Sequence, residues 1–211
     1  MEHLVDLINV EFSRSGYQEL VDGLWINSGA TDFWLVCVLK CDYQVQELQE
    51  QLHSVYAKYF AQYSLMDKNT SLLIIQKVEN VQSKTPEKVV ADENDPYHFK
   101  KYIIQYTLDE WERSKVFLQD NCTLSSVLMS PEIFDVHKAN GVSSSVSLLY
   151  TIAHKLPFVM LPVEQKEFQF KNNLEYKNNR QRELDRWLNS ITSENLISDK
   201  IDEFLSFTLH D

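Results

Sequence analysis

The sequence predicts an α+β protein, in which a small mixed sheet with packed helices is followed by a helical C-terminal region. Glycine occurs only four times in 211 residues, which disfavours many-turned β-barrels and glycine-rich phosphate loops. Two apolar runs are typical of buried strands, and one long stretch repeats apolar residues every three or four positions, as a helix does. After about position 120 the patterns are all helical. We expect an α+β domain over residues 1–120 and a helical region over residues 121–211.

The first elements are a short helix and a hairpin. Residues 2–14 repeat apolar side chains at helical spacing. Residues 23–27 and 32–39 are rich in strand-forming side chains and are separated by the turn sequence Asn-Ser-Gly-Ala-Thr, which predicts a β-hairpin. The second run is apolar almost without alternation, so we expect a central strand that is covered on both faces.

The clearest helical pattern runs from residue 45 to residue 63. Its eight apolar side chains are Val45, Leu48, Leu52, Val55, Tyr56, Tyr59, Phe60 and Tyr63. Burying all eight would contribute on the order of 12 to 24 kcal/mol before the entropy cost, so we expect one long helix that anchors the sheet. Residues 70–78 predict a second central strand, residues 80–86 a polar loop and residues 88–91 a brief strand.

The least ordinary segment covers residues 92–106. Its acidic start predicts a turn, because Asp and Asn side chains bond the backbone two residues further on, and Pro96 favours an extended Asp95. Residues 99–106 predict an edge strand, since both of its faces mix apolar and polar side chains. Such a strand suits a contact surface better than a deep core.

Helical signals dominate the rest of the chain. Thr107 and Glu110 have the spacing of a capping box, which predicts a helix through Trp111. Trp111 is interpreted as either a core anchor or an anchor at a protein interface, as is Trp187. Further helices are expected from Ser130-Pro131 onwards and over residues 142–156, 172–188 and 193–208.

Charge and composition limit the classes of function. A net charge of −11 argues against this chain binding duplex DNA by itself. The basic stretch from Arg180 to Arg186 fits a solvated helical face, or less often a contact to nucleic acid or an acidic partner. No secretory signal or membrane-spanning run is visible, so we expect a cytoplasmic protein with free thiols at Cys37, Cys41 and Cys122.

No catalytic or metal-binding set is predicted. A restriction-type nuclease needs paired acids near an acid-x-Lys strand end, but residues 75–77 read Ile-Gln-Lys, and Asp67 stands alone. The histidines are scattered, and only Asp135 and His137 place two ligand types close together. Residues 141–145 lack the second glycine of a nucleophile elbow. We therefore expect no enzymatic activity, no metal ion and no cofactor.

Residues 92–111 resemble the middle components of three-component ABC-ATPase systems, which are the small subunits of Lamassu-type bacterial defence. Residues 31–36 and 67–74 are similar to the family's early strand and to its asparagine followed by an apolar strand. The likeness covers about residues 30–120. The resemblance implies a partner-contact surface made of Glu93, Asp95, Pro96, Tyr97, Phe99, Lys100, Lys101 and Tyr102, to which Trp111 is added as a possible interface anchor.

The resemblance also implies a function. The chain would be a non-catalytic subunit that joins an SMC-like coiled-coil ATPase to a nuclease effector, and that keeps the nuclease inactive until phage or plasmid DNA is sensed. It would contact nucleic acid only within the complex, and no membrane. Two alternatives are open: a divergent metal-dependent nuclease-like domain using Asp67 and Lys77, and an antitoxin or immunity-type protein whose acidic surface covers a basic active site.

Overall fold

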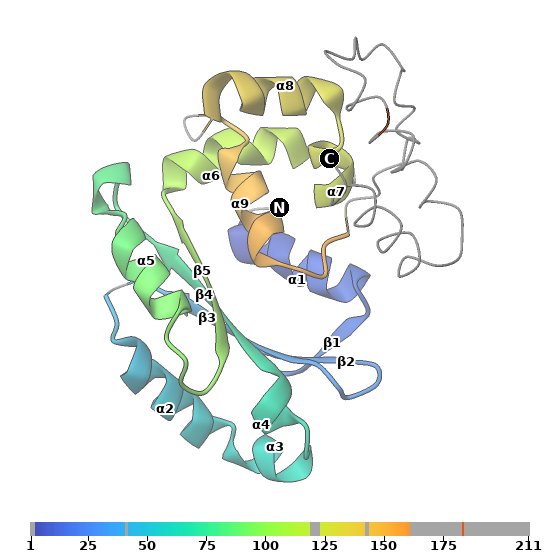
Figure 1. Ribbon diagram of the computed structural model, residues 1–211, viewed down its shortest axis with the longest axis vertical. Coiled ribbons are helices and arrows are strands. Elements are labelled where there is room, and N and C mark those ends of the chain that lie inside the picture. The colour runs from blue at the N-terminus through green and yellow to red at the C-terminus, as the bar shows by residue number, and fades with distance from the viewer. Residues whose placement is uncertain (1–2, 41, 119–122, 142–143, 161–182, 184–211) are drawn as a thin grey trace, which may run out of the picture. The chain divides into compact units, whose positions relative to one another are not determined.

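The computed structural model describes residues 3–40, 42–118, 123–141 and 144–160, together with Glu183 (Figure 1). All of these except Glu183 belong to one compact unit, Met1–Val163. Apart from Glu183, the helices expected at residues 172–188 and 193–208 lie outside the described residues, as do Trp187 and the basic stretch. The domain boundary near residue 120 therefore stays a prediction.

The unit is built around a five-stranded sheet whose strand order follows the chain order. The strands are β1 (Tyr17–Val21), β2 (Leu24–Asn27), β3 (Phe33–Leu39), β4 (Thr70–Lys77) and β5 (Lys100–Tyr106). The pairs β1–β2 and β2–β3 are antiparallel, whereas β3–β4 and β4–β5 are parallel. The expected hairpin over β2 and β3, the second central strand and the edge strand are confirmed.

The turn between β2 and β3 is closed by a side chain. Asn27 Oδ1 accepts hydrogen bonds from the backbone N–H groups of Thr31 (2.8 Å) and Asp32 (3.1 Å). Asparagine is a frequent turn residue because its short amide replaces backbone partners in this way. The turn fixes the register in which Leu24 lies opposite Leu35.

One face of the sheet is covered by helices whose side chains pack on it (Figure 1). They are α1 (Leu4–Arg14), α6 (Leu108–Lys115), α7 (Leu124–Leu128) and α9 (Ser147–Lys155). Their apolar side chains form one core cluster with Trp34, Leu73, Ile75 and Ile104 of the strands. α6 begins with the expected capping box, in which Thr107 Oγ1 accepts from the N–H of Glu110 (3.1 Å). α8 (Pro131–Asn140) begins after Ser130 as expected, contacts α7 and contains no fully buried residue.

The opposite face carries the crossover connections between the parallel strands. These are α2 (Val45–Val55), α3 (Ala57–Gln62) and α4 (Met66–Asn69) between β3 and β4, and α5 (Pro86–Glu93) between β4 and β5. They pack on a second cluster that contains Leu35, Leu72, Ile74 and Ile103. The predicted α+β class, a small mixed sheet with packed helices, is confirmed. Among the described residues, no helix combines the length and apolar character that a membrane span requires.

The helix expected over residues 45–63 is divided at Tyr56. This residue ends α2 and precedes α3, with φ −98° and ψ 13°, and its hydroxyl donates to the carbonyl oxygen of Asp22 (2.6 Å). The expected burial was also wrong in extent. Of the eight apolar side chains only Val45 is fully buried, and Val55 is 68 % exposed. The estimate of 12 to 24 kcal/mol therefore overstates what this segment contributes.

The brief strand expected at residues 88–91 is wrong, because these residues lie in α5. Thr85 precedes the helix and Pro86 occupies its first turn, where a proline loses no hydrogen bond. The helix start at Thr85-Pro86 therefore decides the structure here, although Val89 and Val90 are β-branched residues that favour strands. The strand that was expected to be covered on both faces, β3, is central but not fully covered, since Val38 is 49 % exposed.

Candidate partner-binding surface

The loop between α5 and β5 contains the segment on which the predicted contact surface rests. Asp95 Oδ1 accepts a hydrogen bond from the N–H of Tyr97 (3.3 Å), two residues further on. This is the side-chain turn that the sequence predicts at Asp95-Pro96. The loop lies at the end of the sheet where the parallel strands begin, because it leads directly into Lys100, the first residue of β5.

The side chain of Lys101 stabilises this loop through hydrogen bonds to its backbone. Its side chain is fully buried, and Nζ donates to the carbonyl oxygens of Asp95 (2.9 Å), Tyr97 (2.8 Å) and Phe99 (2.9 Å). Nζ also lies 3.4 Å from Asp95 Oδ2. An ammonium group has three donors, and all three are used here. A buried charge is costly unless it is paired and hydrogen-bonded, so the loop conformation and the lysine stabilise each other.

Gln49 of α2 fixes the loop from a second side. Its side chain amide is fully buried, donates to Asp95 Oδ2 (3.1 Å) and accepts from the N–H of Phe99 (3.3 Å). The Phe99 ring is buried and stacks on Phe60 of α3, with ring centroids 5.9 Å apart. The loop is therefore attached to α2, α3 and β5 at the same time.

The charge state of Asp95 is part of this arrangement. Burial by itself would raise the pKa of the Asp95 carboxyl, but hydrogen bonds from the Tyr97 N–H and the Gln49 amide, together with the Lys101 charge, outweigh it. The net effect is a lowered pKa. Asp95 is therefore a carboxylate that is hydrogen-bonded on both oxygens and cannot easily accept a proton.

The outer part of the loop points into solvent. We call the exposed residues Pro96, Tyr97 and His98 the Tyr97 tip; the Tyr97 side chain is 66 % exposed. His98 has φ +54°, a left-handed conformation that few non-glycine residues adopt, and the attached flanks hold it there. An exposed aromatic side chain on a rigid loop loses little entropy when a partner binds it, which suits an interface anchor.

The other predicted surface residues are distributed between surface and core. Glu93 Oε1 accepts from the N–H of Ile103 (2.7 Å), and the Glu93 carboxylate pairs with Lys155. Tyr102 is half-buried and stacks on Trp34. Of the predicted set, Pro96, Tyr97 and Lys100 are exposed, Glu93, Asp95 and Tyr102 are intermediate, and Phe99, Lys101 and Trp111 are buried.

Burial corrects the predicted surface at three positions. Phe99, Lys101 and Trp111 contact the interior of the chain itself, so a partner cannot reach them in this structure. For Lys101 the reason is specific: the sequence pattern places it on one face of an edge strand, but the preceding loop folds over its ammonium group. Two roles were considered for Trp111, a core anchor and an interface anchor. Its burial in the core cluster fits the core anchor. Whether the exposed members form an interface stays a prediction.

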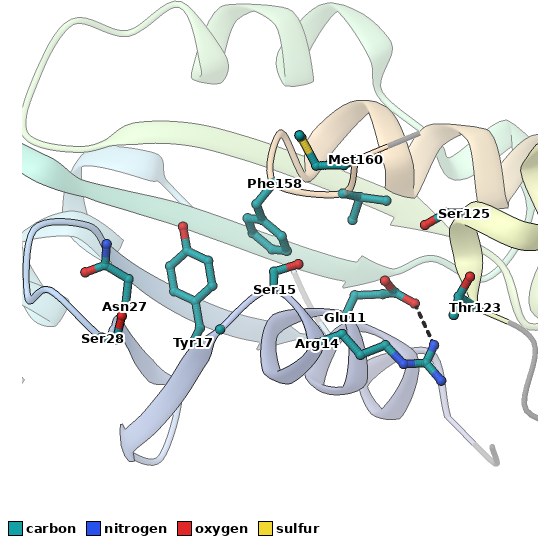
Figure 2. Close-up of a pocket in the computed structure, with 12 residues that line it drawn as sticks. Glu11, Arg14, Ser15, Tyr17, Asn27, Ser28, Thr123, Ser125, Phe158 and Met160 are labelled. Carbon is teal, nitrogen blue, oxygen red and sulfur yellow. Dashed lines mark hydrogen bonds and ion pairs between the residues drawn. The ribbon is translucent and has the colours of Figure 1, made fainter. Parts of the chain in front are cut away.

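A separate pocket of about 690 Å³ contains none of the predicted surface residues in its lining (Figure 2). It is lined by the end of α1, by residues of β1 and β2, by the start of α7 and by residues 158–160. Figure 2 shows Arg14 paired with Glu11, at 3.4 Å. Glu11 is almost fully buried and also accepts from the N–H of Leu124 (3.1 Å). The Tyr17 hydroxyl donates to Asp32, and burial raises the pKa of Tyr17. These polar groups join elements of the fold, and no sequence pattern singled them out.

The two residues of the nuclease-like alternative, Asp67 and Lys77, lie at opposite ends of β4. Asp67 lies in α4, before β4 begins, whereas Lys77 is the last residue of β4, so the strand separates them. Among the described residues, no three His, Cys, Asp or Glu side chains gather as a metal site would require. His137 stacks on Tyr150, with ring centroids 4.1 Å apart. Cys37 is a free thiol, and burial raises its pKa to about 11.

The described part of the chain is a mixed sheet between two layers of helices, with a hydrogen-bonded loop that exposes the aromatic side chain of Tyr97. Residues 32–129 match the family described as ABC-three component (ABC-3C) system Middle Component 1. The matched residues include β3 through α7 and contain the Tyr97 tip. The match supports a middle component of an ABC-3C system, in agreement with the sequence resemblance. No curated protein and no solved structure matches the chain.

Proposed function

We propose that the chain is the non-catalytic middle component of a Lamassu-type ABC-3C defence system. It bridges an SMC-like coiled-coil ATPase and a nuclease effector, and holds the nuclease inactive until phage or plasmid DNA is sensed. ATP hydrolysis and DNA cleavage belong to the partners. The chain acts in the cytoplasm and contacts nucleic acid only within the complex.

The observation that carries this proposal is the family match over residues 32–129, which covers the part of the chain that builds the Tyr97 tip. Lys101 and Gln49 make buried hydrogen bonds to a loop whose Tyr97 side chain is 66 % exposed. Because the loop is already ordered before a partner binds, binding costs less conformational entropy than it would for a flexible loop. The same contacts therefore give a higher affinity. We therefore assign the Tyr97 tip to the contact with one partner.

The test is co-expression of the tagged chain with the ATPase and the nuclease of the same system. We expect both partners to co-purify with the wild-type chain, and Tyr97→Ala to weaken the retention of one of them by about tenfold or more. Phe134→Ala is the matched control, because Phe134 is also an exposed aromatic residue (51 %) but lies on α8, outside the matched residues. Failure of both partners to co-purify with the wild-type chain would contradict the bridging role.

The same preparation tests the inhibitory role. The purified nuclease is expected to cleave DNA more slowly with the chain bound than without it, and DNA added to the complete complex is expected to restore cleavage. Metal-dependent cleavage by the chain alone, lost in Asp67→Ala or Lys77→Ala, would instead establish the nuclease-like alternative. A single toxic partner with no ATPase would favour the immunity-type alternative.

A further inference from the structure

The carboxyl half of the central strand β3 pairs with β4 but, among the described residues, has no paired strand on its β2 side. β2 pairs with β3 only at Phe33 to Leu35, and the next contact is the N–H of Val36 donating to the carbonyl oxygen of Gly23 (2.7 Å). β2 does not extend past this point, because the chain turns at Gly23. Val38 follows two residues later and is 49 % exposed, although it belongs to the middle strand of a five-stranded sheet. Because β2 ends before this point, no strand in the described part of the chain lies beside Val38 on that side, and its side chain is available for contact with another molecule.

Two lysines border this valine. Leu39, the last residue of β3, lies opposite Gln76 in the parallel pair β3–β4, so Lys40 and Lys77 each follow a paired residue at the same end of two neighbouring strands. Both are exposed, and within the described residues neither forms an ion pair. Like charges on neighbouring strands repel each other, and the repulsion is relieved when an anionic group lies between them. We call Val38, Lys40 and Lys77 the Val38 patch.

We propose that the Val38 patch is a second docking surface, which binds a segment of a partner protein that carries an apolar side chain beside carboxylates. The apolar side chain covers Val38, and the carboxylates pair with Lys40 and Lys77. A protein segment fits better than DNA, because two lysines next to a valine, in a chain of net charge −11, neutralise too few phosphates to hold a duplex.

The position of the patch supports a bridge, and in this respect the inference rests on the proposed function. The Tyr97 tip precedes β5, at the end where the parallel strands begin, whereas the Val38 patch lies where β3 and β4 end. A strand of seven residues rises about 3.3 Å per residue, so the two surfaces are roughly 20 Å apart. A subunit that binds two partners at once needs two such separated surfaces.

The experiment compares two double variants of the full chain in the co-expressed complex with the ATPase and the nuclease. Lys40→Glu with Lys77→Glu reverses both charges of the patch. The control, Lys68→Glu with Lys138→Glu, reverses two other exposed lysines and makes the same change in net charge. We expect the patch variant to bind one partner about ten- to a hundredfold more weakly and the control to bind both as the wild type does. Val38→Thr, which keeps the branched shape, is expected to weaken the same partner several-fold.

The partner that the patch variant loses is compared with the partner that Tyr97→Ala loses. The inference requires that the patch variant and Tyr97→Ala lose different partners. Loss of the same partner by both, or retention of both partners by the patch variant, would overturn it while leaving the bridging function standing. If the wild-type chain binds neither partner, the proposed function itself fails.

Other occupants of the patch would give different signals, and each would also overturn the inference. A lower thermal unfolding midpoint of the isolated patch variant relative to the control would show that the chain itself covers the patch. A change from dimer to monomer in light scattering would identify a second copy. A loss of binding to a short DNA duplex, with both protein partners retained, would identify nucleic acid.

Discussion

Glu93 and Lys155, 62 positions apart in the sequence, form an ion pair with Nζ 2.5 and 2.6 Å from the two carboxylate oxygens. Glu93 ends α5 and Lys155 ends α9, and these helices cover opposite faces of the sheet. The same carboxylate accepts from the N–H of Ile103 in β5, which is the edge strand. An edge strand presents unpaired N–H groups to solvent, so Glu93 both joins the two helical layers and closes part of the edge.

Substitutions at Glu93 are expected to separate these two contributions. Glu93→Gln keeps an acceptor for the Ile103 N–H and loses the ion pair, whereas Glu93→Ala loses both. Both side chains of the pair are about a quarter exposed or less, and solvent screens the charges in part. We expect the free energy of unfolding to fall by about 1 kcal/mol for Glu93→Gln and by about 2–3 kcal/mol for Glu93→Ala in urea titrations. Equal effects of the two substitutions would contradict the edge-closing role.

Lys101→Met is expected to be among the most damaging single substitutions in the described part of the chain. It leaves three carbonyl oxygens and the Asp95 carboxylate without their buried donor. Removing one partner of a buried charge network costs about 3–5 kcal/mol. Lys100→Met is the matched control, because the neighbouring lysine is exposed; its effect should stay within about 0.5 kcal/mol. Chemical unfolding of both variants measures the difference, and similar values would show that Lys101 does not stabilise the loop.

Asp95 predicts a dependence of stability on pH in the acid range. Its pKa is lower in the folded chain than in the unfolded chain, so the unfolded state binds protons first as the pH falls. The stability from this carboxylate is fully present above about pH 4 and is lost as the pH drops through the lower folded pKa. Asp95→Asn should therefore be less stable than the wild type at neutral pH, with a gap that narrows below about pH 4. Urea titrations of both proteins between about pH 3 and pH 7 measure this gap, and a gap that does not change with pH would contradict the role of the Asp95 charge.

Gly23 lies in a turn that leaves no room for a side chain. It has φ +74°, and an added Cβ would lie 2.7 Å from the carbonyl oxygen of Val36. Gly16 has a similar φ of +83° but no atom within 4 Å of an added Cβ. Gly16→Ala should cost only the left-handed conformation, about 1–2 kcal/mol, and Gly23→Ala that cost plus a further 1–3 kcal/mol or so for the clash. Thermal unfolding of the two variants measures this difference, and equal midpoints would contradict the close approach of Gly23 to β3.

Local patterns predicted the elements whose signals are themselves local. The apolar run of β4 and the capping box at Thr107 lie within a few residues, and both are found where they were expected. β1 was not predicted, although Asp22-Gly23 between two strand-forming runs is a recognised hairpin signal. The Pro86 helix start was likewise present in the sequence but was given less importance than the valine pair that follows.

Other features depend on partners far away in the sequence and carry no local signal. The break at Tyr56 involves a hydroxyl that reaches a carbonyl oxygen 34 positions earlier, and Gln49 contacts residues 46 and 50 positions later. The alternation of side chains along β5 predicts on which face of the strand Lys101 lies. It does not predict that the preceding loop closes over the ammonium group. The candidate surface was therefore located correctly along the chain, whereas its division into exposed and buried residues required the packing.

The agreement between strand order and chain order has a consequence for biosynthesis. Every strand pairs with its neighbours in sequence, so the sheet contacts between residues 17 and 106 can form successively as the chain leaves the ribosome. α1 differs, because Glu11 receives the N–H of Leu124, 113 positions later. Phe12 of this helix can pack on Trp25 and Trp34 as soon as the first strands are made, whereas the Glu11 carboxylate has to wait for more than a hundred further residues to be translated before it meets this partner.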